Sequence, residues 1–175
     1  LDEWDVDFRY IHGPRYVGPA LPVDRDLWGV RRSSIELALP HGTETYEEVL
    51  ESPLAGARTV ADIERYPGWP SPAMFDYRDI PAQCAAIRAR DRVVVFMGDR
   101  LNRIAQLKPA MYLRGMENIL ADMVLNPDIA LAIFRKIRLF YRDYLRRILA
   151  AAQGGIDIVL TGDDFGAQQG PLLSA

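Results

Sequence analysis

The stretch GIDIVLTGDDFGAQQGPLLS, residues 155–174, decides the fold class predicted for this chain. Its apolar run, Ile156 to Leu160, has the length and composition of a buried strand. A glycine-containing loop follows, with the adjacent carboxylates Asp163 and Asp164 and then the amide Gln168. Parallel α/β proteins build their sites from polar groups at the carboxyl ends of buried strands. The stretch therefore predicts an α/β protein with a site after this strand.

The residues upstream of this stretch, from about residue 73, read as regular α/β structure. The run Arg92 to Met97 is β-branched and too short for a helix, so it predicts a second buried strand. A long helix from Pro127 to Gln153 carries an apolar stripe, and Gly154 and Gly155 end it. Shorter helices are predicted at residues 81–90, 99–107 and 116–125. This order predicts parallel strands with a right-handed crossover.

Residues 1–72 are predicted to form an irregular segment of strands and turns. Trp28 to Leu39 predicts a strand that could be half of a hairpin, and Thr43 with the acids up to Glu48 predicts a helix start. Residues 52–72 are rich in proline and glycine and predict a wrapping segment with a short helix from Val60 to Arg65. We expect one domain over residues 1–175, with residues 73–175 as its core.

Composition and charge exclude several classes of protein. The apolar content of 49% and the charged content of 26% are those of a globular chain, and a net charge of −3 does not suggest a nucleic-acid binder. No apolar run has the roughly 18 residues of a membrane span. The single cysteine, Cys84, fits a reducing compartment, so a cytoplasmic location is expected. The two histidines and this cysteine lack metal-ligand spacing.

Several polar residues are candidates for a site, and each also has a structural interpretation. Asp163 and Asp164 could hold a cation, share a proton or accept N–H donors from a substrate, or they could form a helix cap or a turn. Asp99 follows the other strand and could also be an N-cap. His12 could be a proton shuttle near the same rim, or a structural histidine. Tyr112 and Arg114 precede Gly115 and could bind an anion, or form a helix end.

Three segments carry a resemblance to a known family. They are Tyr112 to Met123 (YLRGMENILADM), the long helix after Asn126-Pro127-Asp128, and residues 162–174 (GDDFGAQQGPLLS). Together with early segments such as residues 5–9 (DVDFR), they resemble the uroporphyrinogen decarboxylase superfamily, in its decarboxylase-like and corrinoid methyltransferase-like branch. The likeness covers most of the chain, and its closing motif is specific for the superfamily but not for one reaction.

The resemblance implies part of a (β/α)8 TIM barrel, with an N-terminal β-hairpin and wrapping excursion, and natural sequence beyond one or both ends of this chain. It implies a lyase that decarboxylates the carboxylate side chains of a tetrapyrrole-type substrate. Tyr112 matches a substrate-contacting tyrosine, and Arg114, Asp99 and Gln168 are further candidates for substrate binding. Asp164 stands where the decarboxylase has a serine, and His12 lies near the place of its aspartate.

Two alternatives stay open. One is zinc-dependent methyl transfer between a corrinoid protein and a thiol, whose zinc ligands would lie beyond Ala175. The other is a non-catalytic barrel that binds a tetrapyrrole-like ligand. No cofactor and no metal ligand are evident in this chain itself. The expected partner is a small tetrapyrrole or corrinoid-linked molecule, without nucleic acid or membrane, and a homo-oligomer is compatible with the resemblance.

Overall fold

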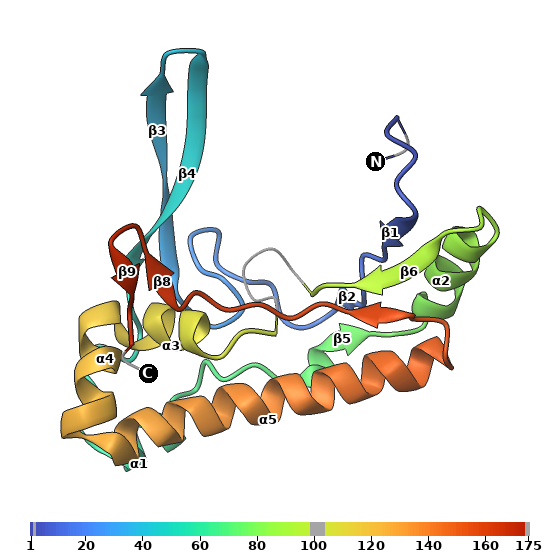
Figure 1. The fold of residues 1–175 in the computed structure, drawn as a ribbon. Coiled ribbons are helices and arrows are strands. Elements are labelled where there is room, and N and C mark those ends of the chain that lie inside the picture. The colour runs from blue at the N-terminus through green and yellow to red at the C-terminus, as the bar shows by residue number, and fades with distance from the viewer. Residues whose placement is uncertain (2, 99–103, 174–175) are drawn as a thin grey trace. The chain divides into compact units, whose positions relative to one another are not determined.

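The computed structural model describes residues 1, 3–98 and 104–173. Within them the chain forms five α-helices, one 3₁₀ turn and nine short strands (Figure 1). The helices are α1 (Val60–Glu64), α2 (Ile80–Arg88), α3 (Leu107–Arg114), α4 (Met116–Leu125) and α5 (Pro127–Ala152), and the 3₁₀ turn is Pro72–Met74. The strands are β1 (Phe8–Tyr10), β2 (Arg15–Tyr16), β3 (Arg31–Leu39), β4 (Gly42–Glu51), β5 (Phe75–Asp76), β6 (Val93–Phe96), β7 (Ile158–Val159), β8 (Gly166–Ala167) and β9 (Gly170–Pro171).

A three-stranded parallel sheet, in the order β1-β6-β7, is the largest sheet among the described residues. Val95 of β6 lies opposite Tyr10 of β1 and Ile158 of β7, so β6 is the central strand. The predicted strands at residues 92–97 and 156–160 are therefore found, and they pair in parallel as predicted. β7 is shorter than its apolar run, and Ile158 stays 46% exposed because β7 is an edge strand in the described chain.

The predicted partial (β/α)8 barrel is wrong. Apart from the β1-β6-β7 sheet, the strands of the described residues form three separate antiparallel pairs, β2-β5, β3-β4 and β8-β9. Parallel strands need a crossover of about a dozen residues or more, whereas antiparallel strands need only a short turn. The β3-β4 and β8-β9 connections have two residues each, so these segments pair locally and add no strand to the parallel sheet.

The helix start predicted at Thr43 to Glu48 is also wrong, because these residues lie in β4. β4 pairs with β3 in an antiparallel register. Leu39 lies opposite Gly42 beside the turn, and Arg32 lies opposite Val49 toward the other end. Thr43, Thr45, Tyr46 and Val49 are residue types that favour strands, and pairing with β3 satisfies their backbone groups. The predicted strand that was half of a hairpin is confirmed as β3, although it begins at Arg31 and not at Trp28.

Contacts between Cα atoms divide the chain into two compact units. Unit 1 comprises residues 1–18, 71–108 and 138–175, and unit 2 comprises residues 19–70 and 109–137. The predicted single domain stays a prediction.

The core of unit 1 lies where α2 and the C-terminal part of α5 meet the parallel sheet. Ile80 and Cys84 of α2, Val94 and Phe96 of β6, and Ile148 of α5 are buried in one cluster. Gly155, just after α5, has to be small. A Cβ atom there would lie 2.9 Å from the Cβ of Cys84. The predicted end of the long helix at the glycine pair is thus confirmed, and tight packing accounts for the second glycine.

The wrapping segment predicted at residues 52–72 contributes buried side chains and hydrogen bonds to unit 2. Leu54 and Ile63 are buried there, as their apolar character requires. The Tyr66 hydroxyl donates to the carbonyl of Trp28 at 2.8 Å, and the Trp69 indole donates to the carbonyl of Ile63 at 2.7 Å. The predicted short helix is confirmed as α1, which Thr59 and Asp62 close with a capping box. Of the helices that the structure describes, none is both long and apolar enough to cross a membrane.

Candidate functional site

The carboxyl edge of the β1-β6-β7 sheet carries the predicted acids and one predicted histidine. His12 follows β1, and Asp163 and Asp164 follow β7. Because the three strands are parallel and adjacent, their carboxyl ends meet at one edge. Asp99, which follows β6 in the sequence, lies outside the described residues. His12, Asp163 and Asp164 belong to unit 1, and we call this region the sheet edge.

His12 is held through its backbone while its side chain stays exposed. Its N–H and the N–H of Gly13 both donate to the Gln83 Oε1, at 2.8 and 3.2 Å, and the Gln83 amide donates back to the Gly13 carbonyl at 2.9 Å. Gly13 has φ +77, and a Cβ atom there would lie 2.8 Å from the Phe96 ring. The turn after β1 is therefore fixed against α2 and β6, and the exposed imidazole of His12 projects from a rigid support.

Asp163 is a cap for the first turn of α3. Its Oδ2 accepts the N–H groups of Gln106 and Leu107, both at 2.6 Å, and its Oδ1 accepts the Lys108 N–H at 2.8 Å. The first N–H groups of a helix have no partner within the helix, and a carboxylate there also interacts favourably with the helix dipole. The interpretation of Asp163 as a helix cap thus agrees with the structure. The helix that it caps lies more than fifty residues away in the sequence.

Asp164 differs from its neighbour because its carboxylate is not taken up by backbone groups. It forms an ion pair with the Nζ of Lys108, and its side chain remains 56% exposed. Asp163 Oδ1 accepts the N–H of Asp164 at 3.0 Å, so the first acid orients the second. The two acids therefore do different work. Asp163 fixes the loop to α3, while Asp164 and Lys108 present an exposed carboxylate and a half-buried ammonium side by side.

Lys108 is a site residue that the sequence did not reveal. The predicted helix at residues 99–107 placed it after a helix end, whereas α3 begins at Leu107. The signal that could have found it is Pro109, because proline is tolerated in the first turn of a helix and there marks a beginning. With α3 started at Leu107, Lys108 lies in its first turn, next to the N–H groups that bind Asp163.

Tyr112 and Arg114 are not in the loop between helices that the sequence predicted. Both lie in the last turn of α3, in unit 2. The Arg32 guanidinium lies 4.5 Å from the centre of the Tyr112 ring, and Arg32 itself pairs with Asp26. A substrate contact of Tyr112 stays a prediction.

Arg114 is buried, and it donates hydrogen bonds to a carboxylate and to backbone carbonyls of the protein. Its Nε donates to Asp122 at 2.7 Å, and its Nη1 donates to the carbonyls of Leu54, Ala55 and Ala57 at 2.7–2.9 Å. Its side chain is 8% exposed and that of Asp122 is 4% exposed. Arg114 thus ties the segment at residues 54–57 to α3 and α4. These contacts give it a structural role, and substrate binding through Arg114 stays a prediction.

Gln168 lies in the turn between β8 and β9 and is exposed. Among the residues that the structure describes, no hydrogen bond or ion pair joins it to the sheet edge, and its predicted role in substrate binding stays a prediction. Within the described part of the chain, no three His, Cys, Asp or Glu side chains come together as a metal site. Methyl transfer on zinc is a prediction that these residues do not test.

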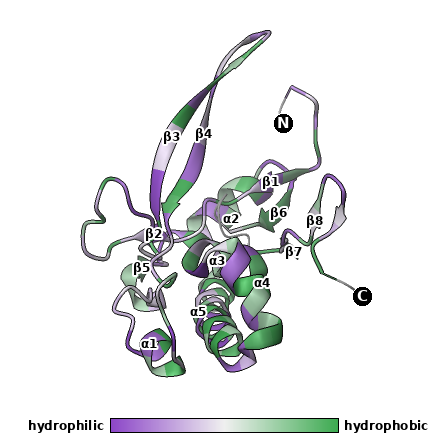
Figure 2. Ribbon diagram, turned by 90° about the vertical axis from the view of Figure 1, so that its left-hand side faces the viewer, coloured by the Kyte–Doolittle hydropathy of each residue, from purple (hydrophilic) through white to green (hydrophobic). Residues whose placement is uncertain are grey.

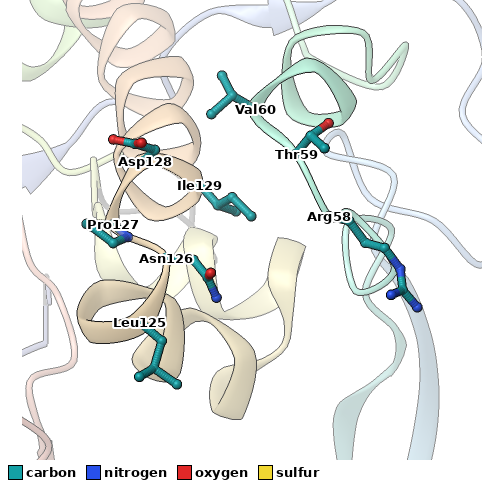
Figure 3. Close-up of a pocket in the computed structure, with 8 residues that line it drawn as sticks. All are labelled: Arg58, Thr59, Val60, Leu125, Asn126, Pro127, Asp128 and Ile129. Atoms are coloured by element: carbon teal, nitrogen blue, oxygen red, sulfur yellow. The ribbon is translucent and has the colours of Figure 1, made fainter.

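A cavity of about 330 Å³ lies in unit 2, between the start of α1 and the junction of α4 with α5 (Figure 3). Figure 3 shows Val60 and Ile129 facing its interior, while Arg58 and Asp128 lie toward opposite sides. None of the predicted site residues lines it.

Comparisons with known proteins add no relative to this description. No protein-family model, no curated protein and no solved structure matches the chain. The arrangement at the sheet edge therefore has to be interpreted from its own chemistry.

Proposed function

We propose that the sheet edge is a substrate site, and that this protein takes part in decarboxylating carboxylate side chains of a tetrapyrrole-type substrate. The observation that carries the proposal is the Asp164–Lys108 pair, an exposed carboxylate beside a half-buried ammonium, in a loop that Asp163 joins to the start of α3. The sequence resemblance supplies the substrate class. The proposed site lies at the edge of three parallel strands, so it does not depend on a closed barrel.

The paired charges of the site match the two kinds of polar group on such a substrate. A pyrrole ring offers N–H donors, which a carboxylate accepts. Substrate carboxylates need a cation, which Lys108 supplies once the substrate separates it from Asp164. Exchanging one ion pair for two substrate contacts keeps both charges compensated, so neither is left unpaired when water is excluded.

The reaction requires an electron sink, two proton additions and the loss of one proton. A proton adds to a ring carbon, the bond between the side-chain methylene and its carboxylate breaks, and the electron pair enters the ring as CO₂ leaves. A second proton then adds to the methylene carbon, and the ring returns the first proton. Asp164 stabilises the cationic ring through its N–H group, and the exposed imidazole of His12 is the proton donor.

The test uses uroporphyrinogen, a reduced tetrapyrrole with acetate and propionate side chains, as the probe. CO₂ release and the mass of the product report turnover, and retention of the probe on ultrafiltration reports binding. We expect Asp164→Asn to lower turnover about 10²–10³-fold, as is typical when a charge that stabilises a transition state is lost. His12→Gln should lower turnover about 10²-fold or more while the probe still binds.

A matched control is Asp79→Asn, an exposed acid of unit 1 for which no side-chain capping bond is found. It should leave both readouts unchanged. Binding without CO₂ release by the unaltered protein would overturn the enzymatic proposal and leave a ligand-binding role. Turnover that is the same in Asp164→Asn and the unaltered protein would show that the sheet edge is not the site.

A further inference from the structure

The β3-β4 hairpin is a second feature of the chain that calls for a partner. Every residue from 34 to 48 is exposed. These residues form most of the hairpin that β3 and β4 make (Figure 1). A two-stranded ribbon is marginally stable on its own in water and needs a further layer to cover its apolar side chains. This ribbon carries both hydrophobic and hydrophilic residues along its length (Figure 2).

One face of the ribbon is apolar with two acids. Alternate residues of a strand point to the same face, and residues directly opposite on paired strands share that face. Ile35 lies opposite Tyr46, Leu37 opposite Glu44, and Leu39 opposite Gly42. The four apolar side chains are 37–60% exposed. Glu48, opposite Ser33, lies on the same face, which we call the apolar-acidic face.

The charge of the ribbon decides what kind of surface can cover it. Residues 33–50 contain four glutamates and no lysine or arginine. If two such ribbons packed face to face, Glu44 and Glu48 of each would meet a surface of the same sign, which is unfavourable. The complementary surface therefore has to combine apolar groups with positive charges.

The outer face of α5 has this combination. Arg135, Arg138 and Arg142 are three or four residues apart, so they lie on one face of the helix, and all three are exposed. Leu131, 62% exposed, and Leu149, 42% exposed, continue the same stripe on either side. Among the residues that the structure describes, none of the three arginines forms an ion pair, whereas Lys136, Arg146 and Arg147 each do.

We propose that the apolar-acidic face of the hairpin of one copy of this protein docks on the arginine stripe of α5 of a second copy. The spacing of the charges agrees. Four residues of strand separate Glu44 from Glu48 by about 13 Å, and seven residues of helix separate Arg135 from Arg142 by about 10.5 Å, a difference that flexible arginine side chains cover. Ile35, Leu37 and Tyr46 then pack beside the methylene groups of the arginines and the leucines of the stripe. This docking is independent of the chemistry at the sheet edge.

Charge reversal with mixing tests the docking. The hairpin variant is Glu44→Lys with Glu48→Lys, and the helix variant is Arg135→Glu with Arg142→Glu, the two arginines whose spacing matches the two glutamates. Sedimentation velocity over a range of concentrations measures self-association. The unaltered protein should associate, and each variant alone should associate at least about tenfold more weakly, because lysine then faces arginine or glutamate faces glutamate. An equimolar mixture of the two variants should regain association, since every contact in the mixed assembly again joins opposite charges.

The matched control is Glu36→Lys with Glu47→Lys, which makes the same change of charge on the opposite face of the hairpin. This control should weaken self-association much less than the hairpin variant does. A monomer at every concentration of the unaltered protein overturns the proposal. So does association that neither variant changes, or a mixture that stays as weak as its components, since the hairpin would then dock on something other than α5.

Discussion

The two ends of α3 carry two ion pairs that look alike in the sequence and differ in the structure. At its last residue, Arg114 is buried with Asp122 and bonds three backbone carbonyls. In its first turn, Lys108 pairs with Asp164, and the two side chains are 32% and 56% exposed. The first pair is surrounded by protein, and the second is open to water.

This difference separates a structural charge from one that can act on a ligand. A ligand site needs groups that can exchange their protein partner for a substrate at little cost. Buried charges lose too much when a partner leaves, because the remaining charge is neither solvated nor paired. Exposed pairs lose little, since water replaces the partner. The following changes test the contrast, in order of their expected effect on stability.

Arg114→Met should have the largest effect. It removes the bonds to three carbonyls and leaves Asp122 as an uncompensated buried charge apart from the Asn126 amide, which donates to it at 3.0 Å. Breaking a buried ion pair by removing one partner costs about 3–5 kcal/mol. The free energy of unfolding from urea denaturation measures the loss. The double variant with Asp122→Asn should recover part of it, and a loss under about 1 kcal/mol for Arg114→Met would contradict the structural role of this pair.

Asp163→Ala should have an intermediate effect. The change leaves the N–H groups of Gln106, Leu107 and Lys108 without their acceptor, and loss of a capping side chain costs roughly 1–2 kcal/mol. Hydrogen exchange at these three amides should quicken, while the amides of β6 exchange as before. Equal exchange at residues 106–108 in both proteins would show that Asp163 does not cap α3 in solution.

Asp157→Asn should have a smaller effect that depends on pH. The backbone N–H of Val94, which donates to Asp157 at 2.8 Å, and the nearby Arg88 guanidinium lower the pKa of this carboxyl. The folded state therefore binds fewer protons than the unfolded state. The stabilisation is present above the unfolded pKa of about 3.9 and is lost as the pH falls through the lower folded pKa.

The measurement for Asp157 is the urea midpoint at pH 7 and at pH 3, compared between the unaltered protein and the variant. Other aspartates with a lowered pKa, such as Asp76 and Asp143, remain in both proteins, so the comparison isolates one group. The variant should be less stable at pH 7, and the difference between the two proteins should be smaller at pH 3. A difference of the same size at both pH values would show that the charge of Asp157 is not what stabilises the β6-β7 joint.

The sequence predicted the elements whose determinants are local. The apolar runs at residues 92–97 and 156–160 and the glycines after Gln153 need only their neighbours to form strands and a helix end. The acids at residues 44–48 led to a wrong prediction, because a threonine cap followed by acids is typical of a helix start. Only the pairing with β3 selects the strand. The barrel failed for the same reason, since each strand pairing depends on residues far away.

The roles of the charged residues depend on partners that the sequence does not place. Nothing around Arg114 indicates that the carbonyls of residues 54–57 bind its guanidinium. Asp163 and Asp164 look equivalent in the chain, and only the position of the α3 N-terminus makes one a cap and leaves the other exposed. Identifying candidate residues by type is therefore feasible from sequence, while deciding which of them can still bind a ligand requires the structure.

Asp164→Asn should have the smallest effect on stability, about 0–1 kcal/mol, because its pair with Lys108 is exposed and solvent replaces it. The asparagine still accepts a hydrogen bond from Lys108, so the loop keeps its conformation on the Asp163 anchor. The urea midpoint should stay close to that of the unaltered protein, even though the same change removes the charge proposed to act on the substrate. Stability and function then separate at this residue. A loss as large as that of Arg114→Met would place Asp164 among the structural charges and remove the contrast between the two ends of α3.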